Sequence, residues 1–366
     1  MMRGPFVFAL VLSCLWAHPA WAASPRRQAL ERDRLLGELD AATLGLENEF
    51  TQPRPKGEAA LHGTVTLQYV TPVGGQSQAA AAMVQGDALL RHGRYGLSLT
   101  PRLKIDSFAA PVQTGSLFFQ QAYAFVGVPT GEVKIGKVLG QLGRLWDFSL
   151  FGPVITNYDY KLTPDLGVSF EGQLKGLKRR SLSYALQYFV LDGRTFSVAN
   201  DSLLSAKKAR RRHNVTARVV PQGFMGPVHV AWGLSAQTYQ ALQGARHQVW
   251  RAATDLAVSY RWLEGFVEVG RQAASDVSSM NLAVSPFNYL WAGAQASWGP
   301  ARVRFHVNTV RHEAPSAGWG VLLQPGAEYV VNEHASLVVE GAAWMAQAAL
   351  PASNEQTVFV FAMLHY

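Results

Sequence analysis

From residue 61 onward, apolar and polar side chains alternate along the chain with a period of two. Near residue 300, for example, Val303, Phe305 and Val307 alternate with Arg304 and His306. Successive side chains of a β-strand point to opposite faces, so this pattern predicts strands with one apolar face and one polar face. A soluble antiparallel sheet shows the same alternation, so the pattern alone does not select a membrane protein.

The number and spacing of these segments narrow the choice. Sixteen segments begin near Leu61, Ala80, Arg94, Leu117, Glu132, Asp165, Leu182, Asn214, Val228, Gln248, Gly265, Asn288, Arg302, Gly320, Ser336 and Thr357. Tight connections fall at residues 92–93, 129–131, around 221–223, 263–264, 299–300 and 332–333, and longer polar ones at 139–164, 193–213, 276–286 and 348–356. Short turns on one rim and long loops on the other are typical of outer-membrane barrels.

We therefore predict an all-β fold, a transmembrane antiparallel up-and-down β-barrel of about 16 strands, preceded by a short N-terminal periplasmic helix. Eighteen strands remain open if residues 193–213 contain two merged segments. The composition agrees, because the charged fraction is 16% and the aromatic fraction is 11%. No later run approaches the roughly 18 apolar residues that a membrane helix needs.

The N-terminal 60 residues read differently. Arg3, an apolar run over residues 6–17 and the small-residue site at residues 20–22 predict a cleaved signal peptide over residues 1–22. Cys14 lies within it and is the only cysteine; lipoprotein cleavage there is the alternative. The mature chain then has no thiol, so we expect no disulfide, no thiolate metal site and no cofactor.

Residues 23–60 are predicted to form a periplasmic helical arm and a linker. Leu35, Leu39, Ala42 and Leu46 recur at helical spacing, and residues 51–60 are a polar segment rich in proline and glycine. The arm is interpreted as a helix that assists trimer contact, or as a solvated arm without fixed structure. Residues 61–366 are assigned to the barrel.

The C-terminal segment, residues 357–366, carries one apolar face made by Val358, Val360, Ala362, Leu364 and Tyr366. This segment resembles the C-terminal signal through which the barrel-assembly machinery recognises its substrates. Together with the signal peptide, it predicts that the chain resides in the outer membrane of a Gram-negative bacterium, in contact with its lipid and lipopolysaccharide. The short turns and both ends of the barrel are then periplasmic.

The polar parity is expected to line the pore. Its cations are Arg94, Arg102, Lys104, Lys134, Arg218, Arg251, Arg261, Arg302 and Arg304, with His306 beside them. Its acids are Asp87, Glu171, Asp255, Glu268, Glu328 and Glu340. An excess of cations in a water-filled lumen raises the local anion concentration, so we predict passive diffusion of small hydrophilic solutes with an anion preference. The alternative is that opposite charges pair across neighbouring strands and hold the wall.

The longest internal connection, residues 139–164, is rich in aromatic residues that a surface loop does not need. We predict that it folds inward and narrows the channel. Its candidate constriction residues are Arg144, Trp146, Asp147, Tyr158, Asp159 and Lys161.

Residues 123–194 contain the runs VKIGKVLGQLG, DLGVSFEGQL and LSYALQYFVLDGR. This stretch resembles the corresponding part of the phosphate-selective porin O/P family. The resemblance implies a homotrimeric, sixteen-stranded porin with an anion preference. The long connection departs from a dedicated phosphate path, because its only arginine is Arg144.

Two basic clusters lie outside the predicted lumen. Residues 207–212 are expected in an external loop that binds lipopolysaccharide phosphates or attracts anions, and residues 175–180 in a solvated periplasmic turn. No catalytic or metal-binding motif stands out, so an enzyme is not expected; His229 and His306 are the only candidates for a barrel hydrolase. Nucleic acid is excluded as a partner, because the cations are dispersed by strand parity. A structural or interaction barrel without an open channel, and a channel specific for phosphate or sugar, remain alternatives.

Overall fold

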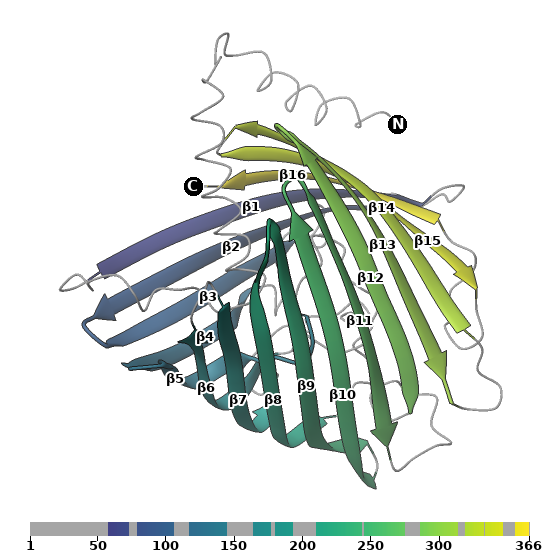
Figure 1. Ribbon diagram of the computed structural model, residues 1–366. Coiled ribbons are helices and arrows are strands. Elements are labelled where there is room, and N and C mark those ends of the chain that lie inside the picture. The colour runs from purple at the N-terminus through teal and green to yellow at the C-terminus, as the bar shows by residue number, and fades with distance from the viewer. Residues whose placement is uncertain are drawn as a thin grey trace.

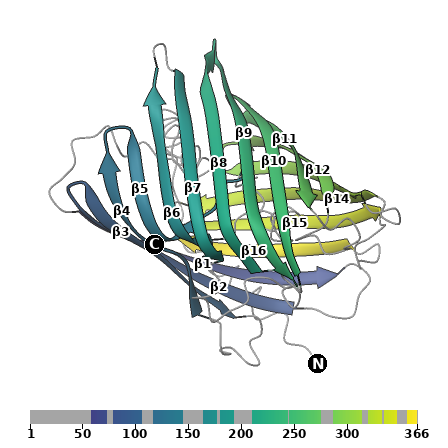
Figure 2. The same ribbon diagram turned by 90° about the horizontal axis from the view of Figure 1, so that it is seen from below.

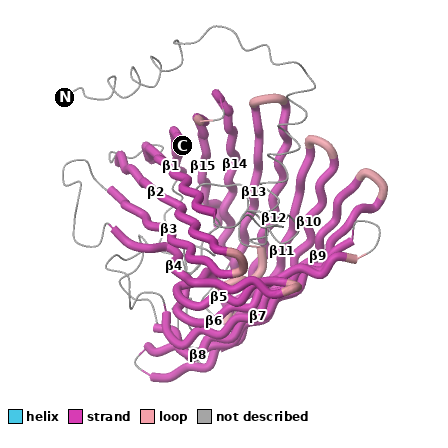
Figure 3. Tube along the Cα trace, turned by 90° about the vertical axis from the view of Figure 1, so that its left-hand side faces the viewer, coloured by secondary structure: helices cyan, strands magenta, loops and turns pink. Residues whose placement is uncertain are grey.

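The computed structural model describes residues 58–72, 79–105, 117–144, 164–176, 180–192, 210–243, 245–274, 286–313, 319–332, 334–346 and 356–365. All regular structure in these ranges is β-strand (Figure 3). The described strands are β1 (Glu58–Pro72), β2 (Ala79–His92), β3 (Tyr95–Ile105), β4 (Leu117–Val128), β5 (Gly131–Leu139), β6 (Pro164–Lys175), β7 (Arg180–Asp192), β8 (Arg210–Met225), β9 (Val228–Gln243), β10 (Ala245–Tyr260), β11 (Leu263–Ala274), β12 (Phe287–Trp298), β13 (Ala301–His312), β14 (Trp319–Asn332), β15 (Ala335–Ala346) and β16 (Gln356–His365).

The strands form one closed antiparallel sheet (Figure 1). Each strand pairs with its neighbours in the chain, and β1 pairs with β16 from Thr64 opposite His365 to Pro72 opposite Thr357. Figure 2 shows the same closure, with β1 lying beside β16. Closure leaves no sheet edge with unpaired backbone groups. The predicted up-and-down barrel is confirmed, and each predicted strand start lies within a few residues of the observed one.

The alternation places the two kinds of side chain on opposite faces of the wall. On β13, Val303 and Phe305 are exposed on the outer face, whereas Arg304 and His306 are buried on the lumen face. On β5, the outward Ile135 side chain is 59% exposed. The outer surface is therefore apolar along most strands, and the polar residues of the same strands lie inside.

The connections sort by length, as predicted. Those on one rim are short, the longest being residues 176–179; those on the other range from residue 244 alone to residues 140–163. One predicted turn was wrong: residues 221–223 continue β8, and the turn lies at Gly226 and Pro227. Pro221 lacks an N–H, and the pairing of β8 with β9 skips Val220 and Pro221, yet the strand goes on.

The basic loop predicted over residues 207–212 differs from the structure in its last three residues. Arg210, Arg211 and Arg212 belong to β8 rather than to a loop, and their backbones pair with Leu242, Ala241 and Gln240 of β9. The sequence predicts a loop there because the next alternating segment begins near Asn214. The long β9 strand nevertheless supplies partners for their backbone groups, and pairing overrides the local pattern.

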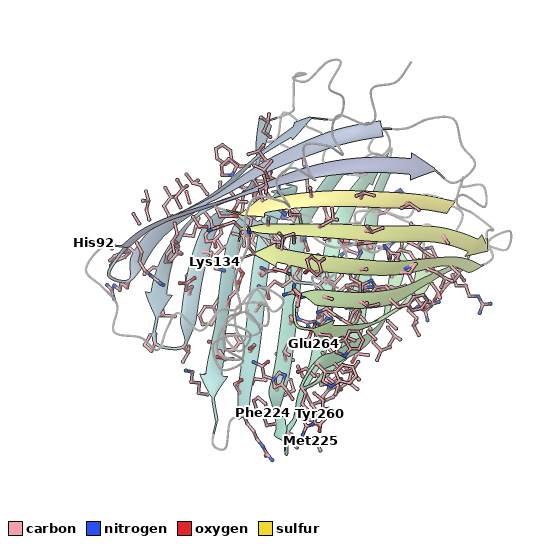
Figure 4. All side chains as sticks on the ribbon, turned by 90° about the horizontal axis from the view of Figure 1, so that it is seen from above. His92, Lys134, Phe224, Met225, Tyr260 and Glu264 are labelled. Atoms are coloured by element: carbon pink, nitrogen blue, oxygen red, sulfur yellow. The ribbon has the colours of Figure 1, made fainter. Side chains whose placement is uncertain are left out.

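Aromatic side chains gather where the strands meet the short turns. Exposed or half-exposed rings there belong to Tyr95, Phe224, Tyr260, Trp262, Trp298 and Tyr329. The Trp262 and Trp298 ring centroids lie 5.3 Å apart. Figure 4 shows Phe224, Met225 and Tyr260 together at this end of the strands. Such a ring of aromatic residues is typical of the level at which a barrel meets the membrane–water boundary.

The predicted signal peptide, the helical arm and most of the linker lie outside the described residues.

If the apolar face contacts lipid, a cation in the middle of a strand will be destabilising. We expect Ile135→Arg to lower the free energy of unfolding in lipid vesicles by about 2–4 kcal/mol, because a guanidinium replaces a lipid-facing side chain. This change in unfolding free energy is measured by urea unfolding, with tryptophan fluorescence as the signal. Ile135→Leu is the matched control, and equal stability of the two variants would contradict a lipid-facing wall.

Candidate functional site

The lumen wall is the candidate site, and most of the predicted cations face it. Lys134, Arg218, Arg251, Arg302 and Arg304 share the parity of buried polar residues on their strands, as does His306. Arg102 donates from Nε to Gln85 Oε1 at 2.6 Å. The backbone of Lys104 lies in β3, but its side chain is outside the described part.

Two predicted pore-lining residues lie elsewhere. Arg94 and Arg261 are in the tight turns before β3 and after β10, and both are exposed. Arg261 has a φ of 54°. The guanidinium of Arg94 lies 5.1 Å from the Tyr95 ring centroid, and that of Arg261 lies 5.1 Å from the Tyr260 ring centroid. The alternating pattern predicts both residues to be part of a strand, but the strands stop one residue short of them, at the turns.

Several lumen cations are paired with carboxylates on neighbouring strands. Lys134 Nζ lies 2.7 Å from Glu171 Oε2, and Arg218 lies 2.7 Å from Asp255 Oδ2. Arg218 also donates to Ser235 Oγ at 2.7 Å. All these side chains are nearly buried, so each charge depends on its partner for solvation. For these residues, the contacts agree with the alternative prediction that opposite charges pair across neighbouring strands and stabilise the barrel wall.

The same pairing recurs around the barrel. Arg302 and Arg304 approach Glu328 at 3.4 Å and 3.9 Å. Arg91 of β2 and Glu132 of β5 form a further pair at 3.0 Å. The sequence reading missed these last two residues. Arg91 shares the parity of Asp87, and Glu132 that of Lys134, so the same rule could have found them.

Arg251 contacts side-chain amides and an aromatic ring on the neighbouring strands. Its Nε donates to Gln272 Oε1 at 2.7 Å, and its Nη1 donates to Gln237 Oε1 at 3.1 Å. Its guanidinium lies 4.7 Å from the Tyr239 ring centroid. Neutral amides and a ring face thus contact this cation.

His306 lies on the lumen face of β13 and is fully buried. Its ring centroid is 6.0 Å from that of Phe266. Within the described residues, neither ring nitrogen has a hydrogen-bond partner. Its next lumen-facing neighbour, Asn308, donates to Gln324 Oε1 at 2.7 Å.

The chain that leaves β5 turns into the lumen and crosses to the opposite wall. The Gln141 N–H donates to Gln187 Oε1 of β7 at 2.7 Å, and the Gly143 N–H donates to Ser235 Oγ of β9 at 3.0 Å. The Arg144 N–H then donates to Glu268 Oε2 of β11 at 2.6 Å. Residues 140–144, the inward segment, therefore run along the lumen face and contact β7, β9 and β11 in turn.

Apolar packing also holds the inward segment. Leu142 is 1% exposed and belongs to one buried cluster with Phe266, Phe287, Tyr289 and Trp291, all on the lumen face of β11 and β12. The guanidinium of Arg144 lies 4.9 Å from the Phe266 ring centroid. Burial lowers the pKa of this guanidinium, and the Asp255 carboxylate opposes the shift. An arginine remains protonated at neutral pH, so the inward segment carries a positive charge into the lumen.

Only glycine fits at the centre of the inward segment. Gly143 has a φ of 64°, and a Cβ added there would lie 2.5 Å from Glu268 Oε1. The close approach lets Glu268 accept from the Arg144 N–H and, through its other oxygen, from the Tyr289 hydroxyl at 2.5 Å. The other predicted constriction residues, Trp146, Asp147, Tyr158, Asp159 and Lys161, lie outside the described residues.

In the described ranges, no three histidine, cysteine, aspartate or glutamate side chains come together as a metal site would require. Nor do those ranges contain a helix long and apolar enough to cross a bilayer.

Comparison with solved structures identifies the architecture. OmpF of Salmonella typhi, in a complex with daunomycin, superposes with a TM-score of 0.64 at 12% identity, over 85% of this chain and 98% of that one. An anion-selective porin from Comamonas acidovorans has a TM-score of 0.50 at 14% identity, over 85% and 100%. The fold is that of the porins. A trimeric form of OmpT, an outer membrane protein of Vibrio cholerae, shares the porin fold with a TM-score of 0.59 at 11% identity, over 85% and 99%. No protein-family model and no curated protein sequence matches the chain.

The contact between Gly143 and Glu268 can be tested with a matched pair of glycines. Gly143 and Gly226 both have a φ of 64°, but nothing lies within 4 Å of a Cβ added at Gly226. We expect Gly226→Ala to cost about 1–2 kcal/mol of unfolding free energy from backbone strain alone. Gly143→Ala should cost more, because the Cβ also displaces Glu268. Equal losses in denaturant unfolding would show that the inward segment does not press on Glu268.

The buried ion pair makes a second test. Asp255→Asn leaves the Arg218 guanidinium buried without its counter-charge, and we expect a loss of about 3–5 kcal/mol in unfolding free energy. The double variant Arg218→Gln and Asp255→Asn should lose less than the single variant. A double-mutant cycle by urea unfolding measures the coupling, and strictly additive losses would argue against the pair.

Proposed function

We propose that this chain is a porin, a passive diffusion channel for small hydrophilic solutes in the outer membrane of a Gram-negative bacterium. The observation that carries the proposal is the closed sheet of sixteen strands with an apolar outer face and a polar lumen face. Barrels of sixteen to eighteen strands are wide enough for an aqueous channel. The likeness to an anion-selective porin and to other barrels of the outer membrane supports the same function.

The remaining parts of the proposal concern export and assembly. Residues 1–22 are removed as a signal peptide, the barrel-assembly machinery takes up the chain through its last strand, and three copies assemble as a homotrimer. The trimeric form of OmpT supports the last point by analogy of fold. The residues between the signal peptide and β1, 23–57, form the periplasmic arm and linker.

We also propose an anion preference, but one that depends on fewer cations than the number on the lumen face. Lys134, Arg218, Arg302 and Arg304 are close to carboxylates, so their fields largely cancel. Arg251 contacts two glutamine amides and the Tyr239 ring, and Arg144 enters the lumen with the inward segment; these are the two cations on which the anion preference is proposed to depend. Phosphate selectivity has support only from the resemblance of residues 123–194 to the porin O/P family.

A second candidate function has one observation in its favour. The inward segment crosses from β5 to β11, and the lumen-facing groups around it, Gln187, Ser235 and Glu268, are buried. A lumen filled in this way would suit a structural or interaction barrel that does not conduct. Reconstitution into planar bilayers separates the two functions. Stepwise conductance is expected for the porin, and electrically silent insertion of folded protein would exclude it.

The charge argument predicts the effect of one substitution on selectivity. In a salt gradient, we expect Arg251→Gln to shift the reversal potential toward cations, because it removes a positive charge from the lumen face. Arg261→Gln removes an equal charge from an exposed turn and should leave the reversal potential unchanged. An unaltered potential in the Arg251 variant, or cation preference in the wild type, would refute the assignment. Current block by phosphate, compared with sugars, tests solute specificity.

A further inference from the structure

Three exposed cations lie along one part of the rim that carries the short turns. Arg94 is in the turn before β3, and Lys175 and Arg180 flank the connection between β6 and β7. Backbone hydrogen bonds hold both turns beside β4 and β5. Gly127 of β4 donates to the Arg94 carbonyl at 2.6 Å, and a backbone N–H of β6 donates to the Thr130 carbonyl at 3.0 Å. We call the three cations the basic arc.

The basic arc is positively charged. The Arg94 guanidinium donates to the Tyr95 hydroxyl at 2.8 Å and lies 5.1 Å from the Tyr95 ring centroid. Within the described ranges, no carboxylate lies within ion-pair distance of the three cations. Glu132, a described carboxylate near the arc, is paired with Arg91 at 3.0 Å. The arc therefore has a net charge of about +3 at neutral pH.

The chain enters the barrel at the same rim. Glu58, the first residue of β1, pairs with Arg91, which precedes Arg94 at the end of β2. Residues 23–57 therefore join the barrel beside one end of the basic arc. The far end of the arc, at β7, is six strand spacings from β1. At about 4.8 Å for each spacing, the arc ends roughly 29 Å from β1.

Part of the preceding chain has the opposite charge. Residues 35–49, the acidic segment, contain four acids and no lysine or arginine. The acids are Glu38, Asp40, Glu47 and Glu49. Residues 50–57 join this segment to β1 and contain two prolines, which favour an extended chain of about 3.1 Å per residue. This linker reaches about 25 Å, so the acidic segment can extend over most of the arc.

We propose that the acidic segment docks on the basic arc of its own barrel. The proposal rests on the periplasmic arm proposed above. A net charge of about −4 on the segment is complementary to the arc, and such complementarity steers association and fixes its orientation. Each exposed ion pair is weak, but a short tether keeps the local concentration of the segment near the mM range. The docked segment then lies along the rim from β1 towards β7.

The acidic segment of a second copy and an anionic phospholipid head group are the competing occupants of the arc. The tether favours the chain's own segment, because its docking requires no second molecule. The number of charges also favours it over a single phosphate, since four carboxylates are available to the cations of the arc.

Disulfide trapping in the full-length protein tests the docking. In a Cys14→Ser background, Asn48→Cys places a thiol in the acidic segment, and Thr130→Cys places one in the exposed turn between the two ends of the arc. We expect a disulfide to form within one chain of the folded protein at low salt. His334→Cys replaces Thr130→Cys in the control. It lies in the turn between β14 and β15, which is closer to β1 around the ring, so an undirected tether would reach it more easily.

A triple variant tests whether charge directs the acidic segment. We expect Arg94→Gln, Lys175→Gln and Arg180→Gln together to slow disulfide formation at residue 130 about tenfold, because several weak exposed pairs are lost at once. Arg261→Gln removes an exposed charge from a short turn outside the arc and should leave the rate unchanged. Salt at 1 M, where the screening length is about 3 Å, should act as the triple variant does.

Charge reversal on both sides separates docking from a general loss of structure. Lys175→Glu with Arg180→Glu should slow trapping, and the further changes Glu47→Lys and Glu49→Lys should restore it. Failure of this rescue, or equal trapping rates at residues 130 and 334, would overturn the proposal. Electrophoretic mobility before and after heating verifies that each variant is folded.

Two other outcomes would assign the arc to another occupant. A disulfide that joins two chains, seen as a dimer on a denaturing gel, would assign the arc to the arm of a second copy. Loss of trapping on addition of phosphatidylglycerol would assign it to lipid head groups. Either result overturns the proposal.

A measurement without introduced cysteines gives an independent test. A protease that cleaves after glutamate should cut at Glu47 and Glu49 more slowly in the wild type than in the triple variant, because docking covers these peptide bonds. Mass spectrometry of the products measures both rates. Equal rates of cleavage would overturn the proposal even if trapping is slow for another reason.

Channel recordings separate this inference from the proposed function. The triple variant should insert into planar bilayers and conduct in steps. Conductance by a protein whose acidic segment is not trapped at the arc would overturn the docking alone. Trapping in a protein that inserts but is electrically silent would overturn the channel alone.

Discussion

Closure of the sheet through β1 and β16 is the constraint on which the rest of the structure depends. Once the strands form a ring, every outward side chain has one kind of surrounding and every inward one has another. The period-two pattern is then more than a local preference. It decides which residues meet lipid and which meet one another across a confined lumen, where opposite charges on adjacent strands come within contact distance.

The confined lumen explains why counting charges gives an incomplete picture of the pore. On one strand, Arg218 is simply a cation with the right parity. In the closed barrel it lies against Asp255 of β10 and Ser235 of β9, and its field is largely neutralised. Arg251, two lumen positions away from Asp255 along β10, donates to two glutamines. Residues of the same type and parity thus acquire different electrostatic roles from their cross-strand neighbours.

The inward segment shows how one backbone conformation can connect distant parts of the wall. A positive φ at Gly143 brings the chain close enough for Glu268 to accept from its backbone, and Leu142 enters the apolar cluster of β11 and β12. Aromatic residues inside the barrel would be unfavourable in an open aqueous lumen. They are accommodated because the inward segment covers them, so the composition of this part of the wall and the path of the chain from β5 depend on each other.

The sequence by itself determined the class of fold, the strands and the sorting of the connections, because alternation and turn residues are local properties that pleat geometry converts directly into strand faces. Most of the cations expected in the lumen lie on strands with lumen parity. Arg94 and Arg261 lie in turns, and Arg210 to Arg212 lie in β8, because the ends of strands depend on pairing partners. Only the tertiary structure decided which charges are paired, that residues 140–144 reach β11, and that Arg94 belongs to the same rim as Lys175 and Arg180. These relations join residues far apart in the chain, and they follow from the register of neighbouring strands around a closed ring, which no local pattern contains.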